Sequence, residues 1–122
     1  REVYQLCQSY NAEVIAQVGT VADAREAVQL GASCVVAQGR EAGGHGLRPE
    51  LGMGTLSLAA AVVVELSSTG VPVLAAGGIA SGRCVLSVLA LGCSGAALGT
   101  RYLATDEALT RAEYKEKVVD SS

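Results

Sequence analysis

The chain has 122 residues, of which half are apolar, 17% are charged and 3% are aromatic, and its formal net charge is −3. Such a chain offers neither the basic surface nor the stacking aromatic side chains on which nucleic-acid binding depends. Its longest apolar run, Leu58–Val64, is far shorter than the roughly 20 residues that cross a membrane. We therefore expect neither a nucleic-acid partner nor a membrane partner.

The first half of the chain predicts two strands and a helix between them. Residues 1–10 resemble the end of a preceding element, and Glu13–Val18 is a short β-branched run typical of a strand. Thr20 opens a helical pattern that Gly31 ends, because a hydroxyl caps a helix start and glycine adopts the left-handed conformation at a helix end. A second strand is expected at Ser33–Gln38, before a long glycine-rich stretch.

The second half of the chain repeats this alternation. Its predicted elements are a helix over Thr55–Ser68, a strand over Val71–Ala75, a helix from Ser81 through Leu91 and a strand over Ser94–Leu98. Thr105, with two acidic residues after it, predicts one further helix start, and residues 109–122 form a polar C-terminal tail or helix. No linker or shift in composition divides the chain, so residues 1–122 are expected to form a single domain.

Strands that alternate with helices pair in parallel, so the fold class is α/β. A doubly wound sheet and a (β/α)8 barrel both satisfy this pattern. The GxGxxG fingerprint that a dinucleotide-binding doubly wound sheet needs after its first strand is absent from this sequence. With four β/α units, the pattern favours half of a (β/α)8 TIM barrel.

Glycine-rich loops follow three of the predicted strands, with the sequences GREAGGHG, AGGIASG and LGTRYLAT. Glycine lets a ligand approach the backbone closely, and the amides at a following helix start point at an anion. Barrels bind phosphate with the loops after their last two strands. These loops therefore predict a phosphate site, and the alternative, in which the glycines only make tight turns, is weakened because two such loops occur in succession.

Three segments carry a resemblance to a known family: VVAQGREAGGHG (Val35–Gly46), PVLAAGGIASGR (Pro72–Arg83) and GAALGTRYLATDEA (Gly95–Ala108). They are similar to three successive signatures of the nitronate monooxygenase family, formerly called 2-nitropropane dioxygenase. The resemblance runs from about Glu13 to Ala108 and implies the C-terminal half of an FMN-binding barrel. The implied function is FMN-dependent oxidation of nitronates or nitroalkanes with O2 to a carbonyl compound and nitrite.

The resemblance also implies which residues hold the FMN. Gln38 would hydrogen-bond the flavin ring, and the pair Gly43 and Gly44 would let the backbone lie against the cofactor. Ala97 stands where many relatives have glutamine. The FMN phosphate would be bound through backbone amides by Gly77, Gly78, Leu98, Gly99 and Thr100.

His45 is the only histidine of the chain and lies in the loop that should face the flavin. The resemblance implies that it is the catalytic base that takes the α-proton of a nitroalkane, or that it holds the anionic nitronate, tasks that suit a pKa near neutrality. Two alternatives stay open: His45 is a solvated loop histidine without a role, or a histidine outside this chain is the base. Arg40, Glu41 and Arg48 are expected to be solvated loop charges, and Arg101 either screens the phosphate or forms a surface ion pair.

Two further functions stay open: an NAD(P)H-dependent enoyl-acyl-carrier-protein reductase on the same scaffold, and a catalytically silent fragment or FMN-binding module. A barrel of this kind takes about 250 residues, and half a barrel leaves two sheet edges unpaired. We therefore expect a homo-oligomer or association with an N-terminal half, and a well-folded monomer in sedimentation would contradict this. The four cysteines lack CxxC spacing, which predicts buried free thiols, no metal site and a cytoplasmic protein.

Overall fold

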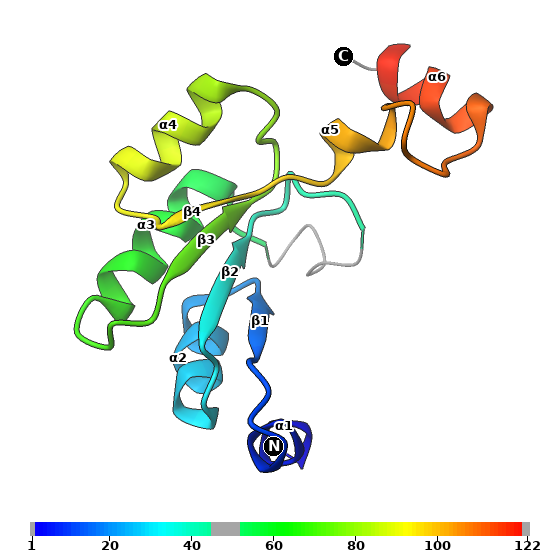
Figure 1. Cartoon of the computed structure of the whole chain (residues 1–122). Helices are drawn as coiled ribbons and strands as arrows, with labels where there is room; N and C mark the ends of the chain where they lie inside the picture. Colours follow the sequence, from blue (N-terminus) through cyan, green and yellow to red (C-terminus); the bar gives the residue numbers. More distant parts are fainter. Residues whose placement is uncertain (1, 45–51, 121–122) are drawn as a thin grey trace.

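The computed structural model describes residues 2–44 and 52–120. Helices and strands alternate along most of these residues (Figure 1). In chain order the elements are α1 (Glu2–Ser9), β1 (Ile15–Val18), α2 (Val21–Leu30), β2 (Cys34–Gln38), α3 (Thr55–Leu66), β3 (Val73–Ala76), α4 (Gly82–Ala90), β4 (Gly95–Ala97), α5 (Thr100–Leu103) and α6 (Ala112–Asp120).

The four strands form one parallel sheet in the order β1-β2-β3-β4, so neighbours in the sequence are also neighbours in the sheet. Cys34 lies opposite Ile15, Val73 lies opposite Val35, and Gly95 lies opposite Leu74. The predicted parallel α/β arrangement is confirmed. Strands β1 and β4 are the edges of the sheet, as the prediction of half a barrel requires.

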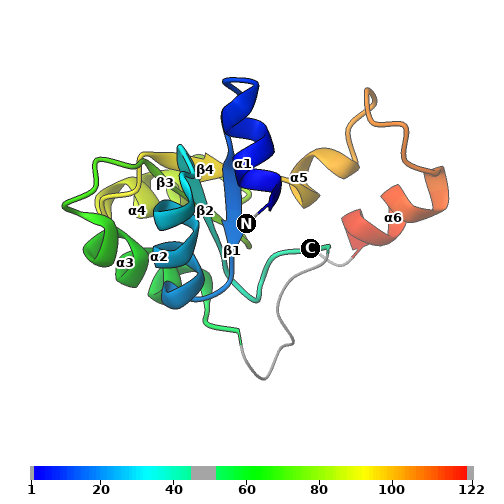
Figure 2. The ribbon, with the colours of Figure 1, turned by 90° about the horizontal axis from the view of Figure 1, so that it is seen from below.

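Helices α2, α3 and α4 pack on one face of the sheet, as Figures 1 and 2 both show. The core lies in this layer, and its largest fully buried side chains are Val35 on β2, Leu58 and Val62 on α3, and Val88 on α4. Arg25 on α2 also donates from its Nε to Glu65 Oε1 on α3 at 2.7 Å. The aliphatic composition thus fills a helix-on-sheet core without large aromatic side chains.

The opposite face of the sheet has no such cover from α2, α3 or α4. Because side chains alternate along a strand, this face carries Ile15 and Gln17 on β1, Gln38 on β2 and Leu74 on β3. Ile15 is 65% exposed although it is a large apolar residue. In a closed barrel this face would be the interior.

Local capping chemistry explains where the helices begin and end. Thr20 Oγ1 accepts a hydrogen bond from the Asp23 N–H at 3.1 Å, and Gly31 ends α2 in the left-handed conformation with φ 101°. Ser81 caps α4 by accepting from the Cys84 N–H at 3.4 Å. These three predictions from the sequence are confirmed.

The prediction of a helix start at Thr105 is wrong. Helix α5 begins five residues earlier, at Thr100, and Thr105 follows its end, where the Thr105 Oγ1 donates to the Tyr102 carbonyl at 3.0 Å. A threonine hydroxyl can bond to a nearby carbonyl as readily as it caps a helix start, so the sequence signal was ambiguous. The polar tail contains α6, which begins at Ala112.

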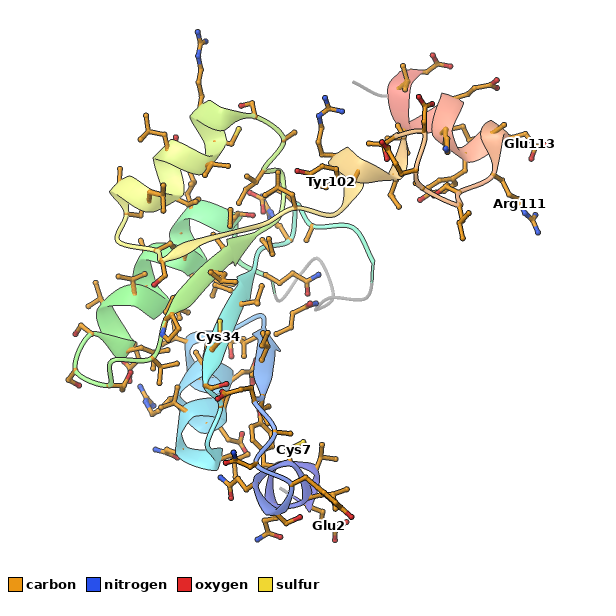
Figure 3. All side chains as sticks on the ribbon, viewed as in Figure 1. Glu2, Cys7, Cys34, Tyr102, Arg111 and Glu113 are labelled. Carbon is orange, nitrogen blue, oxygen red and sulfur yellow. The ribbon has the colours of Figure 1, made fainter. Side chains whose placement is uncertain are left out.

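All four cysteines are free, and Cys7 on α1 and Cys34 on β2 belong to separate elements (Figure 3). The prediction that they are buried is right only for Cys93, since the other three are half-buried. Within residues 2–44 and 52–120, no group of three or more histidine, cysteine, aspartate or glutamate side chains is placed to hold a metal ion. In the same ranges no helix combines the length and the apolar character that crossing a membrane demands.

Candidate cofactor site

The loops that follow β2, β3 and β4 lie at the carboxyl edge of the sheet, because all four strands run in the same direction. This is the edge at which parallel α/β folds bind their ligands. The loops lead into α3, α4 and α5, respectively. The three glycine-rich segments singled out from the sequence therefore share one edge.

Gln38 is the last residue of β2 and is half-buried. Its Nε2 donates to the Gly43 carbonyl at 3.4 Å, and its Oε1 accepts from Gln17 Nε2 at 2.6 Å. The side-chain amide of Gln38 is thus connected both to the loop after β2 and to the neighbouring strand β1.

Gly43 lies beside the start of α5, since a Cβ placed on Gly43 would stand 3.2 Å from Thr100 Oγ1. The loop after β2 and the loop after β4 are therefore in contact across the edge. Gly44 has φ 81°, a conformation that disfavours any side chain, and no atom of the described chain lies within 4 Å of its missing Cβ. Among the described residues, nothing beyond its chain neighbours covers the backbone at Gly44.

Gly77 and Gly78 directly follow β3. Their φ values are 119° and 64°, which only glycine adopts without strain. A Cβ on Gly77 would lie 2.6 Å from Thr55 Oγ1 and 2.9 Å from the Ala42 backbone nitrogen. A Cβ on Gly78 would lie 3.5 Å from Glu41 Cβ. The turn after β3 is therefore packed against the loop after β2.

The connection from β4 to α5 consists of Leu98 and Gly99, and Thr100 is the first residue of α5. Leu98 packs against the core, while Gly99 and Thr100 are exposed. Gly99 has φ −116°, which any residue can adopt, and no atom of the described chain lies within 4 Å of its missing Cβ. Among the described residues, the backbone at Gly99 therefore has room for a bound group.

Glu41 is exposed, as expected of a solvated loop charge, but its carboxylate also has fixed hydrogen-bond partners. Its carboxylate accepts the Thr55 N–H at 2.9 and 3.1 Å and the Thr55 hydroxyl at 3.1 Å. Residue 54, which precedes α3, is a glycine without a side-chain cap, so Glu41 takes the place of the capping residue. The carboxylate thereby fastens the loop after β2 to the start of α3.

Partial burial raises the pKa of the Glu41 carboxyl, but four other interactions outweigh it and hold the pKa below its ordinary value of 4.5. These are hydrogen bonds from the Glu41 N–H, the Thr55 N–H and the Thr55 hydroxyl, and the nearby charge of Arg40. The negative charge is also favoured at a helix start by the helix dipole. Glu41 is therefore held in its charged form and directed at α3 rather than at an incoming anion.

A cavity of about 370 Å³ lies between the start of α4 and α5, with Ser81, Leu98, Arg101 and Tyr102 in its wall. Of the residues predicted to bind the cofactor, Leu98 alone lines it. Arg101 has no ion-pair partner among the described residues, so the surface ion pair that the sequence left open for it is not formed there.

His45 and Arg48 lie outside the described residues. The catalytic role expected for His45 therefore rests on its place in the sequence, directly after Gly44. The described part of this loop, Gly39–Gly44, ends beside Thr100 through the contact of Gly43.

This chain is similar to proteins of a known family. The model of the family described as nitronate monooxygenase matches residues 2–122. The chain belongs to the nitronate monooxygenase family. A nitronate monooxygenase of Neurospora crassa is 46% identical over 110 residues, which cover 87% of this chain and 28% of that protein.

Two solved structures are similar to the whole fold. FabK from Thermotoga maritima has a TM-score of 0.85 at 35% identity and covers 95% of this chain and 35% of that chain. The nitroalkane oxidase from Streptomyces ansochromogenes has a TM-score of 0.84 at 37% identity and covers 94% of this chain and 34% of that chain. These relatives are TIM-barrel enzymes, so the predicted fold class is confirmed.

The chain spans about a third or less of the length of these relatives. Enzymes of the nitronate monooxygenase family depend on a flavin in general. The described edge fits such a cofactor in two respects. Gly77 and Gly78 adopt backbone conformations in which a side chain would be strained, and no described residue other than the chain neighbours covers the backbone of Gly44 or of Gly99.

Proposed function

We propose that this chain forms the FMN-binding half of a flavoenzyme that oxidises nitronates or nitroalkanes with O2 to a carbonyl compound and nitrite. One observation carries the proposal: the three segments that resemble the family come together at one edge of the sheet. Gly43 is packed beside Thr100, and Gly77 is packed against Ala42. FMN, when bound, supplies the redox chemistry, while the protein supplies binding and orientation.

In this proposal the phosphate is held by backbone rather than by charged side chains. The N–H groups of Gly78, Gly99 and Thr100 would donate to the phosphate oxygens, and the short helix α5 would begin behind them. Gly77 supports this set indirectly, since its packing against Ala42 fixes the turn that carries Gly78. The Leu98 backbone would continue this set, while the Leu98 side chain packs against the core.

The flavin ring would lie toward the uncovered face of the sheet, where Gln38 ends β2. Gln38 would donate from its side-chain amide to the ring. Gly43 and Gly44 would allow the loop backbone to lie flat beside it, because neither carries a side chain that would hold the ring away. His45 follows directly and would take the α-proton of the substrate or stabilise the negative charge of a nitronate.

A second candidate is NAD(P)H-dependent enoyl reduction, to which the sequence resemblance also extends. The likeness of fold does not separate the two, because this chain matches two FabK structures with TM-scores of 0.89 and 0.85 and the nitroalkane oxidase with 0.84. Both candidates need the same FMN site and differ in the substrate. Oxygen uptake that depends on a nitronate supports the first, and oxidation of NAD(P)H that depends on an enoyl thioester supports the second.

The first experiment is a titration of the purified chain with FMN, followed by flavin fluorescence. We expect saturable binding, and in the variant Gly78→Asp we expect affinity to fall at least about tenfold, because a carboxylate would repel the phosphate and the side chain would be strained at φ 64°. Gly70→Asp is the matched control. It introduces the same charge and similar strain at φ 73°, in the loop before β3 and therefore at the other end of the sheet.

Equal weakening in both variants would mean that destabilisation, not the phosphate site, explains the loss. A folded wild-type chain that binds no FMN would overturn the proposed cofactor site and favour a catalytically silent fragment.

A further inference from the structure

The side chains of Gln17 and Gln38 form a hydrogen-bonded pair at the carboxyl ends of two neighbouring strands. Both lie on the face of the sheet that α2, α3 and α4 leave uncovered, with Gln17 opposite Val36 and Gln38 two residues further along β2. Gln17 Nε2 donates to Gln38 Oε1 at 2.6 Å. Neither the family resemblance nor the glycine signatures single out Gln17.

The surroundings of this pair determine which way the Gln38 amide faces. The Gly43 carbonyl can only accept a hydrogen bond, so the group of Gln38 that faces it must be the Nε2 donor. The Gln38 Oε1 atom must then face β1, where it needs a donor. Gln17 provides that donor, and a carboxylate of the same shape could not.

The Gln17–Gln38 hydrogen bond contributes little to the stability of the described chain. Gln17 is exposed there and Gln38 is half-buried, so both amides would otherwise bond to water. What the bond does accomplish is to fix the orientation of an amide at the edge where the cofactor site is proposed.

We propose that Gln17 is a positioning residue that fixes the Gln38 amide with its Nε2 toward the Gly43 loop, so that its second N–H is presented to a flavin acceptor. This inference deepens the proposed function and rests on it, because Gln38 is the residue for which the flavin contact is proposed. Gln17 itself need not touch the cofactor.

The test substitutes Gln17→Glu, which keeps the shape of the side chain and removes its donor. Gln29→Glu on α2 is the matched control, with the same change of charge at an exposed position away from the strand ends. The first measurement needs no FMN. In the labelled wild-type chain, nuclear Overhauser contacts of the Gln38 side-chain amide protons should point to Gly43, and in Gln17→Glu they should point to residue 17 instead.

The second measurement is the FMN titration, read as affinity and as the position of the bound-flavin absorbance band. Gln17→Glu should weaken FMN binding about tenfold and shift the band, because the Gln38 amide would be reversed. Gln29→Glu should change neither. A shift of the flavin absorbance band in Gln17→Glu but not in Gln29→Glu is not expected from a general loss of stability.

The possible results distinguish a failure of this inference from a failure of the proposed function. If the Gln38 amide keeps its contacts to Gly43 in Gln17→Glu, or if the amide reverses and FMN binding is unchanged, the inference is overturned while the proposed function stands. If the wild-type chain binds no FMN, the proposed function is overturned and the inference with it. Reversal of the amide together with weaker binding and a shifted band supports both.

Discussion

Gly39→Ala should lower the free energy of unfolding by about 3 kcal/mol, since a side chain forced into a closely packed site displaces its neighbours. Gly39 is buried directly after β2, and a Cβ there would overlap the Oγ1, Cα and N atoms of Thr55. Two of these atoms belong to the backbone, so no rotation of a side chain relieves the overlap. Either α3 shifts its start, or the Gly39 N–H loses its 2.9 Å hydrogen bond to the Ala76 carbonyl.

The matched control for this variant is Gly82→Ala, in which the same methyl group is added at the start of α4. Nothing lies within 4 Å of its missing Cβ, and Gly82 is exposed. Alanine loses less conformational entropy on folding than glycine, so this variant should gain roughly 0.5 kcal/mol. Urea unfolding followed by far-ultraviolet circular dichroism measures both. If Gly39→Ala is as stable as Gly82→Ala, β2 and α3 do not pack as closely as described.

The elements whose positions the sequence predicts well are those that depend on local chemistry. Thr20, Gly31 and Ser81 cap helices as expected, because a cap involves residues that are close together in the chain. The parallel order of the sheet was also predictable, since it follows from strands that alternate with helices. The edge shared by the glycine-rich loops follows from that order.

What the sequence did not predict depends on contacts between residues that are far apart in the chain. Glu41 is 14 residues from Thr55, and it caps α3 only because the loop after β2 folds back over the helix start. The one local signal was that the residue before Thr55 is a glycine, which cannot cap with a side chain. Similarly, Gln17 pairs with Gln38 across two strands, and only the register of β1 and β2 places them together.

Gly39 is a third case: the sequence indicated a special position there, but for a reason different from the one that the structure shows. As part of a glycine-rich stretch, it suggested a loop that approaches a ligand. In the structure it is buried against Thr55, so the need for glycine comes from packing between β2 and α3. Sequence alone does not separate a glycine that makes room for a ligand from one that makes room for a helix.

Glu41→Ala should lower the free energy of unfolding by about 2 kcal/mol, because charge-assisted hydrogen bonds at a helix start are lost. Three hydrogen bonds connect the carboxylate to Thr55, and Thr55 is 4% exposed, so water cannot fully replace them. Glu41→Gln should lose less, since the remaining amide oxygen still accepts one bond. Glu13→Gln, at an exposed position before β1, is the control and should change stability little.

The pH dependence of stability separates the role of the charge from that of the side-chain volume. The pKa of Glu41 is lower in the folded chain than its ordinary value of 4.5, so protonation favours the unfolded state. Its contribution is therefore complete above the unfolded pKa and is lost as pH falls through the folded pKa. Between about pH 6 and about pH 3, the wild-type chain should lose more stability than Glu41→Gln, and Glu13→Gln should follow the wild type.

The comparison of Glu41→Gln with wild type also tests the cofactor site. The Glu41 carboxylate, by capping α3, holds the loop after β2 against Gly78, and a Cβ on Gly78 would lie 3.5 Å from Glu41 Cβ. If the loop serves FMN binding, Glu41→Gln should weaken FMN binding while Glu13→Gln does not. Parallel unfolding curves of wild type and Glu41→Gln across the acid range would show that the carboxylate charge does not stabilise α3. In that case the contact of the loop with Gly77 and Gly78 must be maintained by packing alone, through Ala42 and Thr55.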